Sequence, residues 1–139
     1  MKDFRVLVCG GREYGWKTQP NGNKILDQKQ INFLNTKLNI MLAAVTEIGR
    51  ELIIIQGEAQ GADDWAKKWA IKNNVKTMDF PADWKQHGKY AGFRRNTQML
   101  IEGKPELVIA FPGGNGTKMM CEIAEKGDVT VKKYENVNI

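Results

Sequence analysis

Two spacings of apolar residues divide this chain into strand-like and helix-like segments. Short runs of consecutive apolar residues, such as Leu52 to Ile55 and Leu107 to Phe111, are typical of strands buried on both faces of a parallel sheet. Longer segments carry apolar residues three or four positions apart, which is the spacing of an amphipathic helix. The pattern predicts strands at residues 4–9, 52–55, 75–80, 107–111 and 129–133, and helices at residues 31–48, 62–70, 90–101 and 117–126.

The connecting segments are polar. Residues 13–24 contain glycine and proline and are predicted to cross the surface, residues 81–89 are predicted to form a loop, and residues 134–139 are assigned to no element. Asp27 and Gln30 have the spacing of a capping box at the start of the first helix, and Gly49 ends that helix.

Strands that alternate with helices predict an α/β fold. The simplest arrangement is a Rossmann-like open parallel sheet of about five strands with helices on both faces. At 139 residues the chain is expected to form a single domain spanning residues 1–139. In such sheets, ligands bind beyond the carboxyl ends of the strands.

Three predicted strands are followed by glycine-bearing turns, which therefore meet at one edge of the sheet. They are Gly10-Gly11-Arg12, the turn from Gly57 to Gly61, and Pro112-Gly113-Gly114-Asn115-Gly116-Thr117. Glycines let a ligand approach the backbone, and a helix that starts there offers unpaired N–H groups to an anion. The third turn therefore predicts a phosphate or carboxylate site, although a glycine turn that binds nothing is the simpler alternative.

Composition narrows the range of functions. The net charge is +5, and residues 85–104 contain six basic side chains (counting His87) against one acid, so they attract phosphates or form a solvated surface. No apolar run approaches the roughly 18 residues of a membrane span, and no secretory signal precedes the first strand. One histidine and two separated cysteines, Cys9 and Cys121, predict reduced and packed thiols, no metal site and a cytoplasmic protein. No cofactor is expected.

Four segments together resemble one protein family. They are Val-Leu-Val-Cys-Gly-Gly-Arg-Glu-Tyr (6–14), Gln-Gly-Glu-Ala-Gln-Gly-Ala-Asp (56–63), Ala-Asp-Trp-Lys-Gln-His-Gly-Lys-Tyr-Ala-Gly-Phe-Arg-Arg-Asn (82–96) and Ala-Phe-Pro-Gly-Gly-Asn-Gly-Thr (110–117). In this order they resemble the SLOG superfamily, and more narrowly its YspA/YpsA-related branch. The resemblance implies a Rossmannoid domain that binds nucleotides or nucleotide-derived ligands. The LOG phosphoribohydrolases and the DNA-uptake protein DprA are distant relatives.

The chain departs from the LOG enzymes at a catalytic position. Their motif carries a catalytic glutamate three residues after the threonine, where this sequence has Met120. Glu122 lies about 200° further around the helix, among polar residues, and is expected at the surface, paired with Lys126. The phosphoribohydrolase machinery is therefore not carried over intact.

The resemblance and the residue chemistry together suggest ligand contacts. Arg95 and Asn96 match an Arg-Asn element of the family and are expected to hold a phosphate and a ribose or base edge; the alternative is an arginine that braces a loop by bonding its carbonyls. Arg12 is expected beside the ligand or in a salt bridge with a neighbouring carboxylate. Thr117 offers a hydroxyl to the phosphate or caps its helix. The predicted binding residues are Gly10, Gly11, Arg12, Gly57, Asp63, Trp84, Arg95, Asn96, Pro112, Gly113, Gly114, Gly116 and Thr117.

Carboxylates and aromatic rings near these turns leave several roles open. Asp63 is expected to cap a helix or bond a neighbouring loop, and the resemblance adds a ribose contact. Glu58, Asp63 and His87 are weak catalytic candidates, the carboxylates as groups that orient water and the imidazole as an acid or base. Trp84 stacks on a base or anchors a lid.

Three functions follow from these observations. The first is a domain that senses, sequesters or slowly processes a nucleotide-derived small molecule. The alternatives are a hydrolase that cleaves an N-glycosidic bond in a nucleoside phosphate, and a single-stranded nucleic-acid-binding module using residues 85–104. A homodimer or higher homo-oligomer is also open, with Trp65 and Trp69 serving as core packing or as a subunit interface.

Overall fold

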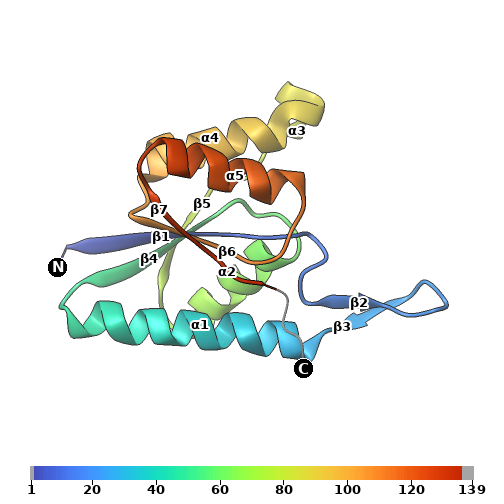
Figure 1. Cartoon of the computed structure of the whole chain (residues 1–139), viewed down its shortest axis with the longest axis horizontal. Helices are drawn as coiled ribbons and strands as arrows, with labels where there is room; N and C mark the ends of the chain where they lie inside the picture. The colour runs from blue at the N-terminus through green and yellow to red at the C-terminus, as the bar shows by residue number, and fades with distance from the viewer. Residues whose placement is uncertain (1, 136–139) are drawn as a thin grey trace.

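A computed structural model describes residues 2–135 and contains a five-stranded parallel sheet covered by helices on both faces (Figure 1). The sheet order is β5-β4-β1-β6-β7, so β1 lies at the centre. The strands are β1 (Asp3–Cys9), β4 (Glu51–Gln56), β5 (Lys76–Asp79), β6 (Leu107–Ala110) and β7 (Thr130–Lys133). The predicted Rossmann-like open sheet is confirmed.

Two pairs of helices cover the two faces. Helices α1 (Gln28–Glu47) and α2 (Ala62–Lys72) lie on one face, and α4 (Ala91–Gly103) and α5 (Asn115–Lys126) lie side by side on the other (Figure 1). Because successive strand residues point to opposite faces, Val6 and Val8 of β1 pack under α1 and α2. Leu7 and Cys9 pack under α4 and α5. The consecutive apolar residues of the strands are thus explained by burial on both sides.

All five strands are parallel, and the order in which the chain adds them to the sheet reverses once, between β1 and β6. The chain adds β4 and then β5 on one side of β1, and returns to place β6 and β7 on the other. The connections that leave β1 and β6 therefore lead to opposite faces, and a crevice opens between them at the carboxyl edge.

Residues 13–24, predicted to cross the surface, form most of an exposed hairpin. Strands β2 (Trp16–Thr18) and β3 (Lys24–Leu26) pair antiparallel and project from the carboxyl edge (Figure 1). The expected capping box is only half formed. Asp27 accepts from the Gln30 N–H at 3.3 Å, but the Gln30 side chain accepts from the Gly15 N–H at 2.7 Å instead of returning to Asp27. Gln30 therefore ties the hairpin to α1.

The other differences lie at element ends. The predicted loop at residues 81–89 contains the short helix α3 (Trp84–His87) and most of a 3-10 turn, η1 (Gly88–Tyr90). Helix α5 begins at Asn115, two residues before the predicted start, so Thr117 lies within its first turn and does not cap it. The backbone N–H of Tyr134 continues the β7 pairing by donating to the Ala110 carbonyl at 2.8 Å.

Gly61 is a position where the fold requires glycine for two reasons. Its φ is +79°, and a Cβ there would overlap the carbonyl oxygen of Gly11. We expect Gly61→Ala to lower the free energy of unfolding by roughly 2–5 kcal/mol, from left-handed strain and backbone overlap together.

The matched control is Gly22→Ala, because Gly22 has a φ of +85° and open space around its Cα. This variant should lose only about 1–2 kcal/mol, the strain alone. Urea unfolding of both variants measures the difference, and equal losses would show that the contact between the β1 and β4 loops does not constrain the fold.

Candidate ligand-binding site

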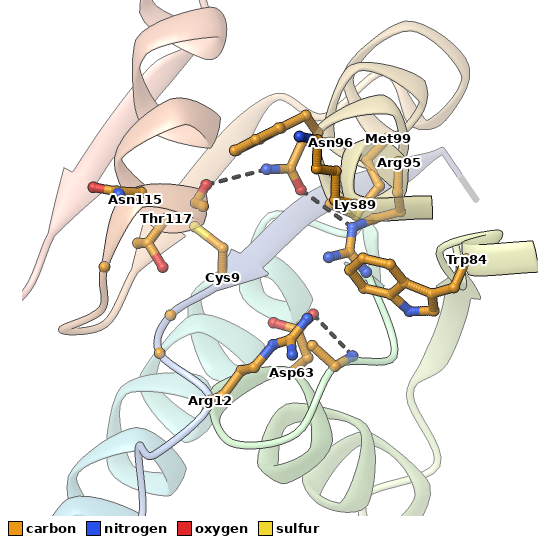
Figure 2. A pocket seen from close by; sticks show the side chains of 17 residues that line it. Cys9, Arg12, Asp63, Trp84, Lys89, Arg95, Asn96, Met99, Asn115 and Thr117 are labelled. Atoms are coloured by element: carbon orange, nitrogen blue, oxygen red, sulfur yellow. Dashed lines mark hydrogen bonds between the residues drawn. The ribbon is translucent and has the colours of Figure 1, made fainter. Parts of the chain in front are cut away.

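A cleft of about 330 Å³ occupies the crevice at the carboxyl ends of β1 and β6. The N-terminal turn of α5 forms one side, α4 and Trp84 form the other, and Arg12 and Asp63 lie below (Figure 2). The residues that line it are Cys9, Gly10, Gly11, Arg12, Ala59, Asp63, Trp84, Lys89, Gly92, Phe93, Arg95, Asn96, Met99, Gly114, Asn115, Gly116 and Thr117.

The glycines around the cleft fall into two groups. Gly10, Gly11 and Gly113 allow the β1 and β6 loops to touch: a Cβ on Gly11 would lie 3.0 Å from the Pro112 carbonyl oxygen, and the Gly11 N–H donates to that oxygen at 2.9 Å. Gly114 and Gly116, by contrast, have nothing within 4 Å of an added Cβ. The first group serves the fold, while the second leaves backbone open to the cleft.

The first turn of α5 faces the cleft with its backbone N–H groups. Gly114 is the N-cap residue, and within residues 2–135 no side chain bonds to the exposed amides of this turn. The first amides of a helix carry partial positive charge, and with the Thr117 hydroxyl beside them they can hold an anion.

Arg95 is half-buried in the wall opposite α5, where it has two internal partners. Its guanidinium donates to the Gly57 carbonyl and to Oδ1 of Asn96, the second at 3.2 Å. Burial lowers the pKa of Arg95 below its usual value, but guanidinium stays protonated at neutral pH. The expected loop brace is therefore present, and the same guanidinium also lines the cleft.

Asn96 connects the two sides of the site. Its Nδ2 donates to the Gly116 carbonyl at 3.1 Å, and its Oδ1 accepts from Arg95 (Figure 2). Because both ends of this buried amide have partners within the chain, Asn96 positions Arg95 and the α5 turn while it also lines the cleft.

Asp63 is a buried carboxylate at the base of the cleft. Its Oδ2 accepts from the Gly57 and Ala59 N–H groups at 3.0 and 3.4 Å, so it bonds the neighbouring loop and does not cap α2. Burial raises the pKa of Asp63 to about 6, although the charges of Arg95 and Arg12 and the two backbone bonds oppose the shift.

Arg12 and Trp84 meet at the cleft. The Arg12 guanidinium lies over the Trp84 ring, 5.5 Å from its centroid, and Trp84 is 49% exposed. Neither the Arg12 nor the Trp84 side chain is in an ion pair or hydrogen bond within residues 2–135. The salt bridge considered for Arg12 is thus absent from the described part of the chain, and both side chains line the cleft.

Several residues predicted for the site do not line the cleft. Gly57, Pro112 and Gly113 form its supporting loops through the backbone contacts described above. Glu58 is paired with Lys67 at 2.6 Å, and His87 lines a separate groove beyond α3. Of the three catalytic candidates, Asp63 lines the cleft, whereas Glu58 and His87 do not.

The cleft also contains residues that sequence reasoning missed. Lys89, Gly92 and Phe93 reach it because α3 and η1 bend residues 84–93 over the carboxyl edge. Lys89 belongs to the basic segment, which is the one signal that pointed to it. Cys9 lies at the base, where its buried thiol donates to the Ile109 carbonyl at 3.9 Å; the neighbouring Cys121 thiol and burial raise its pKa well above the usual range. Both cysteines are free and packed, as expected.

The position that carries the catalytic glutamate in LOG enzymes holds a buried methionine in this chain. Met120 is fully buried in the core beneath α4 and α5. Glu122 is exposed, as predicted, but the expected pair with Lys126 is not among the ion pairs of residues 2–135; on this helix Glu125 is paired with Lys133 instead. The lining of the cleft includes a single carboxylate, that of Asp63.

The fold and the cleft define a Rossmann-like domain with a ligand crevice at the reversal of strand order. The family described as YAcAr, the YspA, cpYpsA-related SLOG family, matches residues 4–87, which is more than half of the chain. The chain therefore belongs to this SLOG family, and the predicted resemblance is confirmed.

Among curated proteins, the chain is similar to the Gene 61 protein of Mycobacterium phage D29. The two are 38% identical over 90 residues, which cover 60% of this chain and 71% of the phage protein. No solved structure matches the chain. In the described residues, no helix has the length and apolar character needed to cross a membrane.

Asp63 gives the fold a specific pH dependence. The pKa of Asp63 rises from 3.8 to about 6 on folding. Between these two values the folded state keeps a proton on Asp63 that the unfolded state has lost. The protonated carboxyl therefore contributes stability at low pH, and this contribution is lost as the pH rises from about 4 to above 6. In Asp63→Asn the titration is absent, while the amide oxygen can still accept from the Gly57 N–H. We expect the stability of Asp63→Asn relative to the wild type to rise by up to about 3 kcal/mol between pH 4 and pH 7.

Urea unfolding of both proteins across this pH range measures the difference between their free energies of unfolding. The titration of all other groups cancels in this difference because both proteins contain them. A difference that stays constant with pH would contradict the raised pKa of Asp63.

Proposed function

We propose that the cleft binds a phosphorylated nucleoside or another nucleotide-derived small molecule. The observation that carries this proposal is the uncapped N-terminus of α5, with open backbone at Gly114 and Gly116, facing the Arg95 guanidinium across the cleft. Helix amides and a guanidinium are complementary to phosphate oxygens. Membership of the SLOG family supports the same class of ligand.

The charge of the cleft favours an anion. Arg12, Lys89 and Arg95 line it against the single carboxylate of Asp63, which is itself largely surrounded by backbone N–H groups. We place the phosphate between α5 and Arg95. The nucleoside then extends toward Trp84, Gly92 and Phe93, where aromatic faces can pack on a base.

Binding is the better-supported activity, compared with hydrolysis. Water activation in a nucleosidase-type reaction needs a free carboxylate or imidazole, and Glu58 and His87 lie outside the cleft while Asp63 already accepts two backbone bonds. The basic side chains of residues 85–104 are shared between the cleft and two neighbouring grooves: Lys89 and Arg95 line the cleft, Arg94 lines both grooves, and His87 and Arg95 line one of them. The open backbone of the first turn of α5 lines the cleft, and this favours a small phosphorylated ligand over a nucleic-acid strand.

Thermal unfolding with a ligand panel tests the proposal. We expect stabilisation by at least one of nucleoside monophosphates, ADP-ribose, NAD or cyclic dinucleotides, and none by unphosphorylated nucleosides. A ligand at 100 times its Kd adds about 2.7 kcal/mol, which raises Tm by several degrees. Short single-stranded DNA is the comparison for the nucleic-acid alternative, and incubation without additives followed by product analysis tests for turnover.

Arg12→Ala and Arg95→Ala locate the ligand. Both should weaken binding by about 1.5–3 kcal/mol, the value of a charge-assisted hydrogen bond. Only Arg95→Ala should also lower stability, because Arg95 braces the Gly57 carbonyl. Lys85→Ala, in the same basic segment but outside the cleft, is the control. A panel without any stabilising ligand, or full affinity in both arginine variants, would contradict the proposed site.

Gly116→Ala separates a ligand-binding glycine from a structural one. Alanine is favoured over glycine inside a helix by about 1 kcal/mol, and an added Cβ at Gly116 meets nothing within 4 Å. We expect the free protein to become slightly more stable and the affinity for the nucleotide to fall at least tenfold, because the methyl group occupies the approach to the α5 amides. Isothermal titration and urea unfolding give the two values. Greater stability with unchanged affinity would place the ligand elsewhere.

A further inference from the structure

The outer side of α4 carries an apolar groove that adjoins the ligand cleft at Phe93. It is lined by Tyr90, Phe93, Arg94, Thr97, Gln98, Ile101 and Glu102, together with Met119 of α5. Tyr90, Phe93 and Ile101 are 57%, 43% and 64% exposed. Residues 90, 93, 97 and 101 are three or four positions apart, so these side chains form one continuous stripe along the helix. Such a stripe is what a partner surface covers.

Two opposite charges lie at the two ends of this groove. Arg94 and Glu102 are eight residues apart, about 12 Å along the helix axis. Neither takes part in any ion pair formed within residues 2–135. The groove is therefore positive at one end and negative at the other, with the uncharged side chains of Thr97, Gln98 and Ile101 between them.

We propose that a second copy of this chain covers the groove, with the two α4 helices packed antiparallel about a two-fold axis. The axis passes beside residues 97 and 98. That placement brings Arg94 against Glu102 of the partner subunit, and Phe93 against Ile101 of the partner subunit. The midpoints of these two pairs are residues 98 and 97, which lie about 1.5 Å apart along the helix, so one axis between them serves both pairs. Two-fold symmetry then forms every contact twice.

The charge pattern argues for a copy of the same chain as the occupant. A surface that is positive at one end and negative at the other is complementary to itself when reversed, which is the requirement of an isologous interface. Trp65 and Trp69 were considered earlier for an interface, but their side chains form hydrogen bonds within the chain. Their indole N–H groups donate to the Tyr14 carbonyl and to Asn39 Oδ1 at 3.0 and 2.8 Å.

The size of the surface sets the expected strength of the dimer. Helix α4 has 13 residues and is about 20 Å long, so a contact along it is smaller than the roughly 800 Å² per partner of a typical stable interface. The dimer should therefore dissociate on dilution through the micromolar range. This inference does not depend on the ligand proposed for the cleft.

Sedimentation equilibrium of the ligand-free chain, from about 1 to 500 µM, tests the interface with a charge-reversal set. Arg94→Glu and Glu102→Arg each replace two attractive contacts by two repulsive ones, and each should raise the dimer Kd at least about tenfold. The double variant restores both contacts in reversed polarity and should return the Kd to within about threefold of the wild type. Lys29→Glu on α1, across the sheet from α4, is the control for an equal change of net charge and should leave the Kd unchanged.

Each result supports or overturns the proposed dimer. Loss of the dimer in both single variants and its recovery in the double variant would support the antiparallel pairing of α4. A wild-type chain that stays monomeric at 500 µM would overturn it. So would a dimer that resists both single reversals, or a double variant that remains dissociated. Circular dichroism of every variant checks that these exposed substitutions leave the fold intact, so that dissociation is not confused with unfolding.

Discussion

Direct contact between loop backbones at the carboxyl edge is the constraint on which the site depends. The loop after β1 touches the loops after β4 and β6 with no side chain between them, and Gly11 takes part in both contacts: its N–H donates to Pro112, and its carbonyl oxygen lies against Gly61. Because these loops lie against one another, the crevice between β1 and β6 is narrow and its walls are held at fixed positions. The cleft is thus a consequence of the same glycines that close the fold.

Buried polar residues extend this constraint from the backbone to the charged groups. Asp63 holds the Gly57 and Ala59 amides, Arg95 holds the Gly57 carbonyl, and Asn96 links Arg95 to the first turn of α5. A guanidinium fixed in this way loses little conformational entropy when an anion arrives, which is the benefit of preorganisation. Bracing the loop and meeting the ligand were treated as alternatives for Arg95, but the geometry makes them compatible.

Different sides of helix α4 face the core, the cleft and the outer groove. Ala91, Asn96 and Met99 are buried toward the sheet, Gly92 and Arg95 line the cleft, and Thr97 and Ile101 face outward. Phe93 lines both the cleft and the outer groove. The cleft and the outer groove are therefore contiguous, and anything that packs against Phe93 from outside is in contact with a wall of the site.

The sequence by itself determined the class of fold and the edge where the site lies. Runs such as Leu52 to Ile55 have too many consecutive apolar residues for a half-exposed strand, so they imply a sheet covered on both faces, and glycines after three such runs imply turns that meet at one edge. The sequence pointed to Arg12, Asp63 and Arg95, which do line the crevice, but it did not determine every side chain that reaches it. Gln30 has the spacing of a capping box yet bonds Gly15, and Glu58 follows a strand yet pairs with Lys67. The bend of residues 84–93 over the edge, which brings Lys89 and Phe93 into the cleft, depends on packing between segments distant in the chain. Local spacing sets periodicity and burial, whereas the direction of a side chain beyond its own turn is decided by the tertiary contacts that compete for it.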